Sequence, residues 1–110
     1  MKSRMLFKLG PSAVVAALLL AGCAGPQVPA VTPADASRAA VRWPGTEIAQ
    51  LDHGRSLFVA HCGSCHLPPS PASLAADRWP AQVQEMRERA GLSVGEATLV
   101  EQYLITVASR

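Results

Sequence analysis

Apolar residues in the second half of the chain recur at the spacing of an α-helix. Ile48, Leu51 and Phe58 share one face of a helix that a cap at Thr46 would begin. Gly54 lies in the middle of this helix, where a glycine costs about 1 kcal/mol relative to alanine. Because such a glycine usually has a packing reason, we expect another helix to pass close to it.

The C-terminal stretch has the pattern of that second helix. Ser93 and Glu96 form a capping box. The following residues place an apolar stripe on one helix face, made of Leu99, Val100, Tyr103, Leu104 and Val107. A close crossing in which Gly54 admits Tyr103 or Leu104 accounts for both patterns.

A third helix lies between these two. Pro80 suits its first turn, and Gly91 ends it. One face of this helix carries four residues at helical spacing, namely Trp79, Val83, Met86 and Ala90. Together the patterns predict a small all-α domain of three to four helices over residues 46–110.

The first 22 residues have the pattern of a secretory signal peptide. Lys2, Arg4 and Lys8 precede an unbroken apolar run over residues 13–21, with no acid among the first ten residues. A membrane-spanning helix needs about 20 apolar residues, so this run is too short to span stably. It ends in Leu-Ala-Gly-Cys23, which resembles the lipobox of bacterial lipoproteins. The resemblance implies that Cys23 is lipid-modified and becomes the first residue of the mature chain.

Residues 23–45 are expected to be a lipid-anchored tether. They hold four prolines among small residues, a composition that buries too little apolar surface to order itself. As a semi-extended linker this segment could reach up to about 60 Å, at the ~3.1 Å per residue of polyproline II. An ordinary signal peptide with a coincidental cysteine is the alternative to an acylated Cys23.

Loss of the signal peptide changes the charge of the chain. The full sequence has a formal net charge of +2 and a calculated pI of 8.6. Removal of Lys2, Arg4 and Lys8 leaves seven arginines against eight acids, a formal charge of −1. Nucleic-acid binding is not expected, because it requires a basic patch or stripe.

The stretch that indicates a chemistry is Cys62-Gly63-Ser64-Cys65-His66. Cys-x-x-Cys-His is the pattern of covalent haem c attachment. Cysteines three apart on a helical turn have Cβ atoms about 5–6 Å apart, so each sulfur can reach one vinyl group of the same porphyrin. His66 can then bind the iron as proximal ligand. A domain of this size rarely builds a sufficient core alone, and one covalent haem c would act as its staple.

Zinc binding and thiol–disulfide exchange also use Cys-x-x-Cys. A structural zinc site takes four nitrogen or sulfur ligands, usually as two spaced pairs, and only His53 and His61 are left to complete it. A thioredoxin-like site requires a strand-to-helix junction, and no strand pattern surrounds the motif. Haem is therefore the favoured interpretation.

Three patterns over residues 50–110 together resemble class I cytochrome c. They are Gly54-x-x-Leu57-Phe58, the haem motif, and a terminal helix with Tyr103-Leu104. The resemblance implies that the N- and C-terminal helices cross near a haem edge, with a small residue at the contact. It also implies that a proline carbonyl, of Pro69 or Pro71, accepts a hydrogen bond from the proximal histidine and raises its donor strength.

Met86 is the expected sixth ligand of the iron. It is the only methionine left after signal cleavage, and a thioether opposite histidine is the arrangement of electron-transfer cytochromes c. The Trp-x-x-x-Val-x-x-Met pattern is also similar to that of small bacterial c-type haem domains, which assigns Trp79 to the cofactor site. Class I members carry the ligand methionine later, in a loop, whereas Met86 is 20 residues after His66 and expected to be helical. The alternative is that Met86 fills the core, with His53 or His61 as reserve ligands.

The sequence predicts a membrane-anchored electron carrier rather than an enzyme, because a six-coordinate haem leaves no position for substrate. The expected partners are other redox proteins or oxidoreductase subunits, on the periplasmic side of the inner or outer membrane. The main alternative is a haem-based sensor or small peroxidase-like protein with an open or labile sixth position. A structural or zinc lipoprotein without haem is the third hypothesis.

Overall fold

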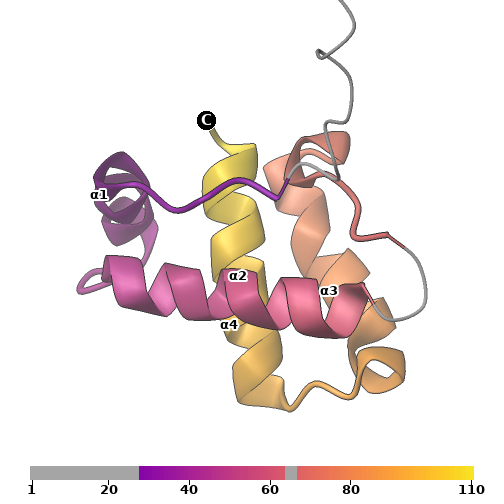
Figure 1. Ribbon diagram of the computed structural model, residues 1–110. Helices are drawn as coiled ribbons and strands as arrows, with labels where there is room; N and C mark the ends of the chain where they lie inside the picture. The colour runs from indigo at the N-terminus through magenta and orange to yellow at the C-terminus, as the bar shows by residue number, and fades with distance from the viewer. Residues whose placement is uncertain (1–27, 64–66) are drawn as a thin grey trace, which may run out of the picture.

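Four α-helices and two short 3-10 turns make up the computed structural model (Figure 1), which describes residues 28–63 and 67–110. The α-helices are α1 (Pro33–Arg42), α2 (Ile48–Cys62), α3 (Trp79–Ala90) and α4 (Val94–Ala108), and the turns are η1 (Pro71–Ser73) and η2 (Ala76–Arg78). No strand occurs in these ranges, so the all-α prediction is confirmed. None of the described helices is long and apolar enough to cross a membrane. The signal peptide, Cys23, Cys65 and His66 lie outside the described residues.

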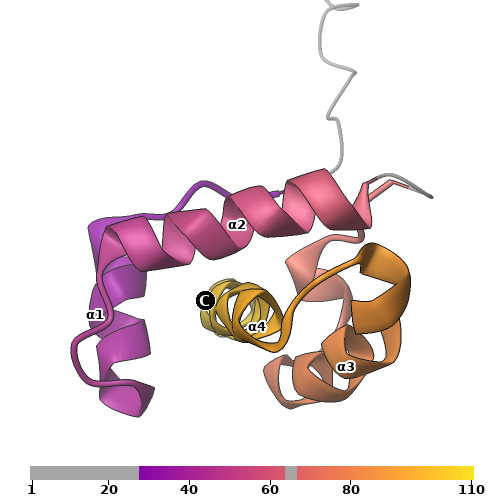
Figure 2. The ribbon, with the colours of Figure 1, turned by 90° about the horizontal axis from the view of Figure 1, so that it is seen from below.

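The helix α2 crosses α4 at close range, and Gly54 lies at the crossing. Figure 1 shows the two helices crossing steeply, and the view in Figure 2 looks along α4 with α2 lying across it. A Cβ atom added at Gly54 would overlap the backbone carbonyl oxygen of Leu99 and lie 3.1 Å from the Cβ of Tyr103. The prediction that Gly54 admits Tyr103 at a close crossing is therefore confirmed.

The hydrophobic core is built around α4. Four residues of its expected stripe are buried, namely Val100, Tyr103, Leu104 and Val107, whereas Leu99 is half-buried. The Phe58 ring lies 6.2 Å from that of Tyr103 and meets Trp79 edge-on at 6.5 Å, measured between ring centroids. Since burying one such side chain contributes about 1.5–3 kcal/mol, this three-helix contact is a main source of stability.

The start of α2 differs from the sequence expectation. The Thr46 hydroxyl donates to the carbonyl oxygen of Trp43 at 2.7 Å, so it does not cap α2, and the N-cap position is one residue later. Leu51 and Phe58 are buried as expected, but Ile48 is 42% exposed. Ile48 is the first residue of the helix.

The ends of α3 and α4 follow the sequence signals. Gly91 comes directly after α3 with a φ of 69°, a left-handed conformation that favours glycine. The expected capping box of α4 is present, with Ser93 N–H donating to the Glu96 carboxylate at 2.8 Å and Glu96 N–H donating to the Ser93 hydroxyl at 3.2 Å. Both signals are local and involve residues at most three positions apart.

Residues 28–45, expected to belong to a tether, are folded onto the domain, and that expectation is wrong. They include α1, whose first turn is a capping box: Thr32 N–H donates to the Asp35 carboxylate at 2.8 Å and Asp35 N–H to the Thr32 hydroxyl at 3.3 Å. Pro33 takes the first helical position, where no intrahelical N–H bond is needed. Ala39 is 2% exposed, so the small residues of this segment allow close packing.

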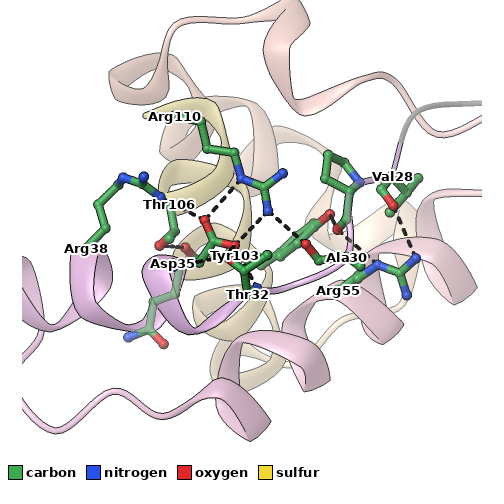
Figure 3. Close-up of polar contacts among 11 residues, drawn as sticks. Val28, Ala30, Thr32, Asp35, Arg38, Arg55, Tyr103, Thr106 and Arg110 are labelled. Atoms are coloured by element: carbon green, nitrogen blue, oxygen red, sulfur yellow. Dashed lines mark hydrogen bonds and ion pairs between the residues drawn. The ribbon is translucent and has the colours of Figure 1, made fainter.

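An ion pair between the buried Asp35 and the partly exposed Arg110 fixes α1 to the end of α4 (Figure 3). The Asp35 carboxylate is 0% exposed and accepts hydrogen bonds from Arg110 Nη2 at 2.6 Å and Nε at 3.1 Å. Arg38 donates to the same carboxylate at 2.8 Å. The hydrogen bonds from Arg110 outweigh the opposing effect of burial and hold the pKa of Asp35 well below its usual value.

Gly54→Ala should destabilise the protein by about 2–3 kcal/mol, because the added methyl meets the α4 backbone rather than a movable side chain. The matched control is Gly95→Ala in the first turn of α4, where an added Cβ meets nothing within 4 Å. That substitution should stabilise by up to about 1 kcal/mol through helix propensity. Urea unfolding followed by circular dichroism measures both, and an unchanged stability of G54A would contradict the close crossing.

Asp35→Asn should lower the free energy of unfolding at neutral pH by about 2–3 kcal/mol, since it removes the charge that Arg110 pairs with. The folded-state pKa of Asp35 lies below its unfolded value, so its stabilisation is complete above about pH 4 and is lost as the pH falls further. The stability difference between wild type and D35N should therefore shrink between pH 7 and about pH 3. Asp52→Asn, at an exposed position, is the control, and a D35N difference that is equal at both pH values would contradict the pair.

Candidate functional site

A cavity of about 350 Å³ lies beside the C-terminal part of α2, one face of α3 and the middle of α4. Its volume falls in the range of small-molecule and cofactor sites, which are mostly apolar with a few polar groups. The wall is predominantly apolar and is formed by Phe58, His61, Cys62, Pro69, Trp79, Gln82, Val83, Met86, Arg89, Ala90, Leu92, Val100 and Leu104. The cavity wall therefore contains residues that precede the Cys62–His66 motif in the sequence and residues that follow it.

Cys62 is the last residue of α2 and lines the cavity. It is half-buried, and this burial raises the pKa of its thiol. The motif partners Cys65 and His66 lie outside the described residues.

One face of α3 forms a continuous part of the cavity wall. All four residues that the sequence places on this face line the cavity, namely Trp79, Val83, Met86 and Ala90. Met86 is half-buried and shares the cavity with Cys62, although 24 positions separate them in the sequence. A thioether and a thiol thus face a common apolar space from two different helices.

Trp79 combines a place in the cavity wall with a structural hydrogen bond. Its side chain is 2% exposed, and its indole Nε1 donates to the Pro71 carbonyl oxygen at 2.9 Å. This bond ties the start of α3 to η1, eight residues earlier. Pro71 therefore already accepts one hydrogen bond, while Pro69 lines the cavity. His66 lies outside the described residues, so its expected hydrogen bond to the carbonyl of Pro69 or Pro71 stays a prediction.

His61, one of the two reserve ligands, is half-buried and lies in the cavity wall. Its Nδ1 is 2.9 Å from the Ala90 carbonyl oxygen. Because a carbonyl oxygen can only accept, Nδ1 carries the hydrogen in this contact. The bond connects the last turn of α2 with the last residue of α3. His53, the other reserve ligand, is exposed and does not line the cavity.

Two polar residues of α3 in the cavity wall were not assigned to the site from the sequence. Gln82 lies four positions before Met86, and Arg89 lies three positions after it. Both spacings put a side chain on the same helix face as Met86, so the signal was present in the periodicity. Neither belongs to the stripe of Trp79, Val83, Met86 and Ala90 from which the sequence predicted this side of the site.

Among residues 28–63 and 67–110, no group of three or more histidine, cysteine, aspartate or glutamate side chains gathers in a way that could hold a metal ion. Comparisons with protein-family models, with curated proteins and with solved structures find no match for this chain. The fold and the cavity thus define a small all-helical domain with an apolar cofactor-sized site. What this site binds is inferred from the residues that line it.

Trp79→Phe should lower the free energy of unfolding by about 1–3 kcal/mol, because the buried Pro71 carbonyl loses its hydrogen-bond donor. The matched control is Trp43→Phe, at a half-buried position at the edge of the core, where the Arg42 guanidinium lies 4.9 Å from the ring centroid. That substitution should cost less than about 1 kcal/mol. Chemical denaturation compares the two, and a larger loss for W43F would contradict the role given to Trp79.

Proposed function

We propose that the protein is a monohaem c-type cytochrome, a membrane-anchored electron-transfer protein whose haem iron is ligated by His66 and Met86. The observation that carries the proposal is the shared apolar cavity of Cys62 and Met86. In the sequence, Cys65 and His66 follow Cys62 directly, so the attachment motif begins at the cavity wall. The resemblance of the sequence to small class I-like cytochromes c supports the same interpretation of this site.

The residues of the cavity fit a haem group chemically. Thiols form the thioether bonds of haem c, and imidazole and thioether are suitable axial ligands of its iron. The walls that Phe58, Val100 and Leu104 supply are apolar and suit a large planar macrocycle. When bound, haem supplies reversible one-electron chemistry at its iron.

Each residue of the site then has a distinct role. Cys62 and Cys65 hold the cofactor covalently, and His66 binds the iron from the adjoining position in the chain. Met86 fills the sixth coordination position, excludes other ligands and favours a high reduction potential. Trp79 holds the loop at Pro71 against the start of α3 and would supply part of the apolar wall beside the cofactor.

A second candidate function keeps the haem but leaves the sixth position open or labile. The observation that favours it is the presence of His61, Gln82 and Arg89 in the cavity wall, since polar groups are what a haem enzyme or sensor uses to handle oxygen or peroxide. The half-buried thioether of Met86 in the same wall supports the electron carrier instead. Carbon monoxide binding distinguishes the two functions.

We expect the reduced Met86→Ala variant to bind carbon monoxide, whereas the reduced wild type should not bind it. In the reduced wild type, Met86 occupies the sixth position, whereas the variant leaves it open. We also expect the reduction potential to fall by on the order of 100 mV, a fraction of the ~0.8 V that axial ligands span. Glu85→Ala, at an exposed position on α3, is the matched control and should retain the wild-type spectrum and potential. An M86A protein with an unchanged spectrum would show that Met86 only fills the core.

The lipid anchor is part of the proposal and has its own test. Cys23→Ala should abolish labelling by a fatty-acid analogue and release the haem domain from the membrane fraction, because the acylated residue is lost. Cys23→Ala leaves the Cys62–His66 motif intact, so haem staining should be retained in the soluble fraction. Membrane association that persists without Cys23 would contradict acylation at this position.

A further inference from the structure

The segment before α1 is bound to the domain by three side chains (Figure 3). We name residues 28–32 the strap. Arg55 of α2 donates to the carbonyl oxygens of Val28 and Pro29, both at 3.1 Å. The Tyr103 hydroxyl donates to the Pro29 carbonyl at 2.7 Å, and Arg110 Nη2 donates to that of Ala30 at 2.8 Å. Three consecutive carbonyl oxygens are therefore held by donors from α2, from α4 and from the residue at the C-terminus.

Two donors of the strap, Tyr103 and Arg110, have a pKa above the ordinary value of their side chain. Burial raises the pKa of Tyr103 to about 12, so its hydroxyl remains a donor. Arg110 also pairs with Asp35, which is buried in the first turn of α1. The strap and α1 thus behave as one unit with α4, and the domain includes Val28 rather than starting near residue 46.

This arrangement leaves a short connection to the proposed lipid anchor. Five residue steps separate Cys23 from Val28, and a fully extended chain of that length reaches at most about 18 Å. The helix α4 has 15 residues and is therefore about 22 Å long. The connection is shorter than the domain that it holds. The strap is bound by Tyr103, nine positions after the start of α4 at Val94, which corresponds to about 14 Å along the helix. The end of α4 opposite to the strap could therefore meet the bilayer only with the connection close to its full extension.

We propose that the strap-bearing end of the domain, formed by the strap and the C-terminal end of α4, docks on the bilayer surface. The proposal rests on acylation of Cys23 in the proposed function, and its occupant is the lipid headgroup layer. The cavity residues Val100 and Leu104 precede Arg110 by ten and six positions, which corresponds to about 15 and 9 Å along α4. The haem cavity is thereby held near the membrane, where a redox partner embedded in that membrane can reach it.

The test uses the full-length, haem-loaded and acylated protein in vesicles of phosphatidylethanolamine and phosphatidylglycerol. Ser109→Cys marks the strap-bearing end, and Gly95→Cys marks the opposite end of α4; Ser109 is exposed, and a Cβ added at Gly95 meets nothing within 4 Å. Each cysteine carries a benzophenone probe, and cross-links to lipid are counted by intact mass. The native cysteines are consumed by lipid and haem under the proposed function, so the unsubstituted protein should take up no probe.

We expect the probe at residue 109 to cross-link lipid several times more often than the probe at residue 95. Inserting about 20 Gly/Ser residues after Gly25 gives the connection between Cys23 and Val28 an average end-to-end distance of roughly 28 Å. The cross-linking yields at residues 109 and 95 should then be similar. Equal yields at the native length would overturn the docking proposal while leaving the anchor in place. Failure of the native chain to bind vesicles, or probe uptake at its own cysteines, would overturn the proposed acylation or haem attachment and the docking with it.

Discussion

The close crossing of α2 over α4 at Gly54 is the constraint on which the rest of this structure depends. No side chain separates the two backbones there, so the Leu99 carbonyl of α4 lies directly against α2. This contact sets the direction in which α2 leaves α4 and therefore where its last residue, Cys62, ends up. Figure 2 shows α2 crossing α4 and ending on the side where α3 lies. The residues that line the cavity come mainly from these three helices. A bulkier residue at position 54 would move Cys62 and Met86 relative to each other.

The second organising feature is polar and lies at the other end of α4. Asp35, Arg110 and the strap connect the N-terminal segment of the domain to its C-terminus through bonds that span 75 to 80 positions of the chain. In a domain with a small core, such long-range bonds add stability where apolar burial is limited. They also replace the expected free tether by an ordered segment, which restricts how the domain can lie against a membrane.

Local signals were sufficient for much of the fold. The capping box of α4 and the glycine after α3 were correctly predicted, because each depends on residues at most three positions apart. The role of Gly54 was predicted as well, since a glycine inside a helix requires a close neighbour. The segment of α1 was misjudged, although Thr32 and Asp35 carry a capping box, because its prolines and small residues dominated the composition. Its partners on α4 could not be identified without the tertiary structure.

In the candidate site, too, patterns within one helix were predictable, whereas contacts between elements were not. Helical periodicity placed Trp79 and Met86 on one face, and both line the cavity. The hydrogen bond between His61 and the Ala90 carbonyl depends on how α2 and α3 approach each other, which periodicity within one helix does not encode. The Trp79 bond to Pro71 likewise requires the loop to fold back onto α3. Sequence patterns therefore identified residues that share a helix face, whereas contacts between elements came from the fold.

The central claim is that the cavity beside Cys62 holds one covalently attached, six-coordinate haem. Its most direct test is the optical spectrum of the reduced protein, made in a bacterium that matures c-type haem, recorded with and without carbon monoxide. The account predicts a low-spin c-type spectrum that carbon monoxide does not change and haem absorbance that survives denaturation and gel separation. A protein from this host without haem absorbance would contradict the account, and a spectrum that shifts rapidly with carbon monoxide would contradict ligation by Met86.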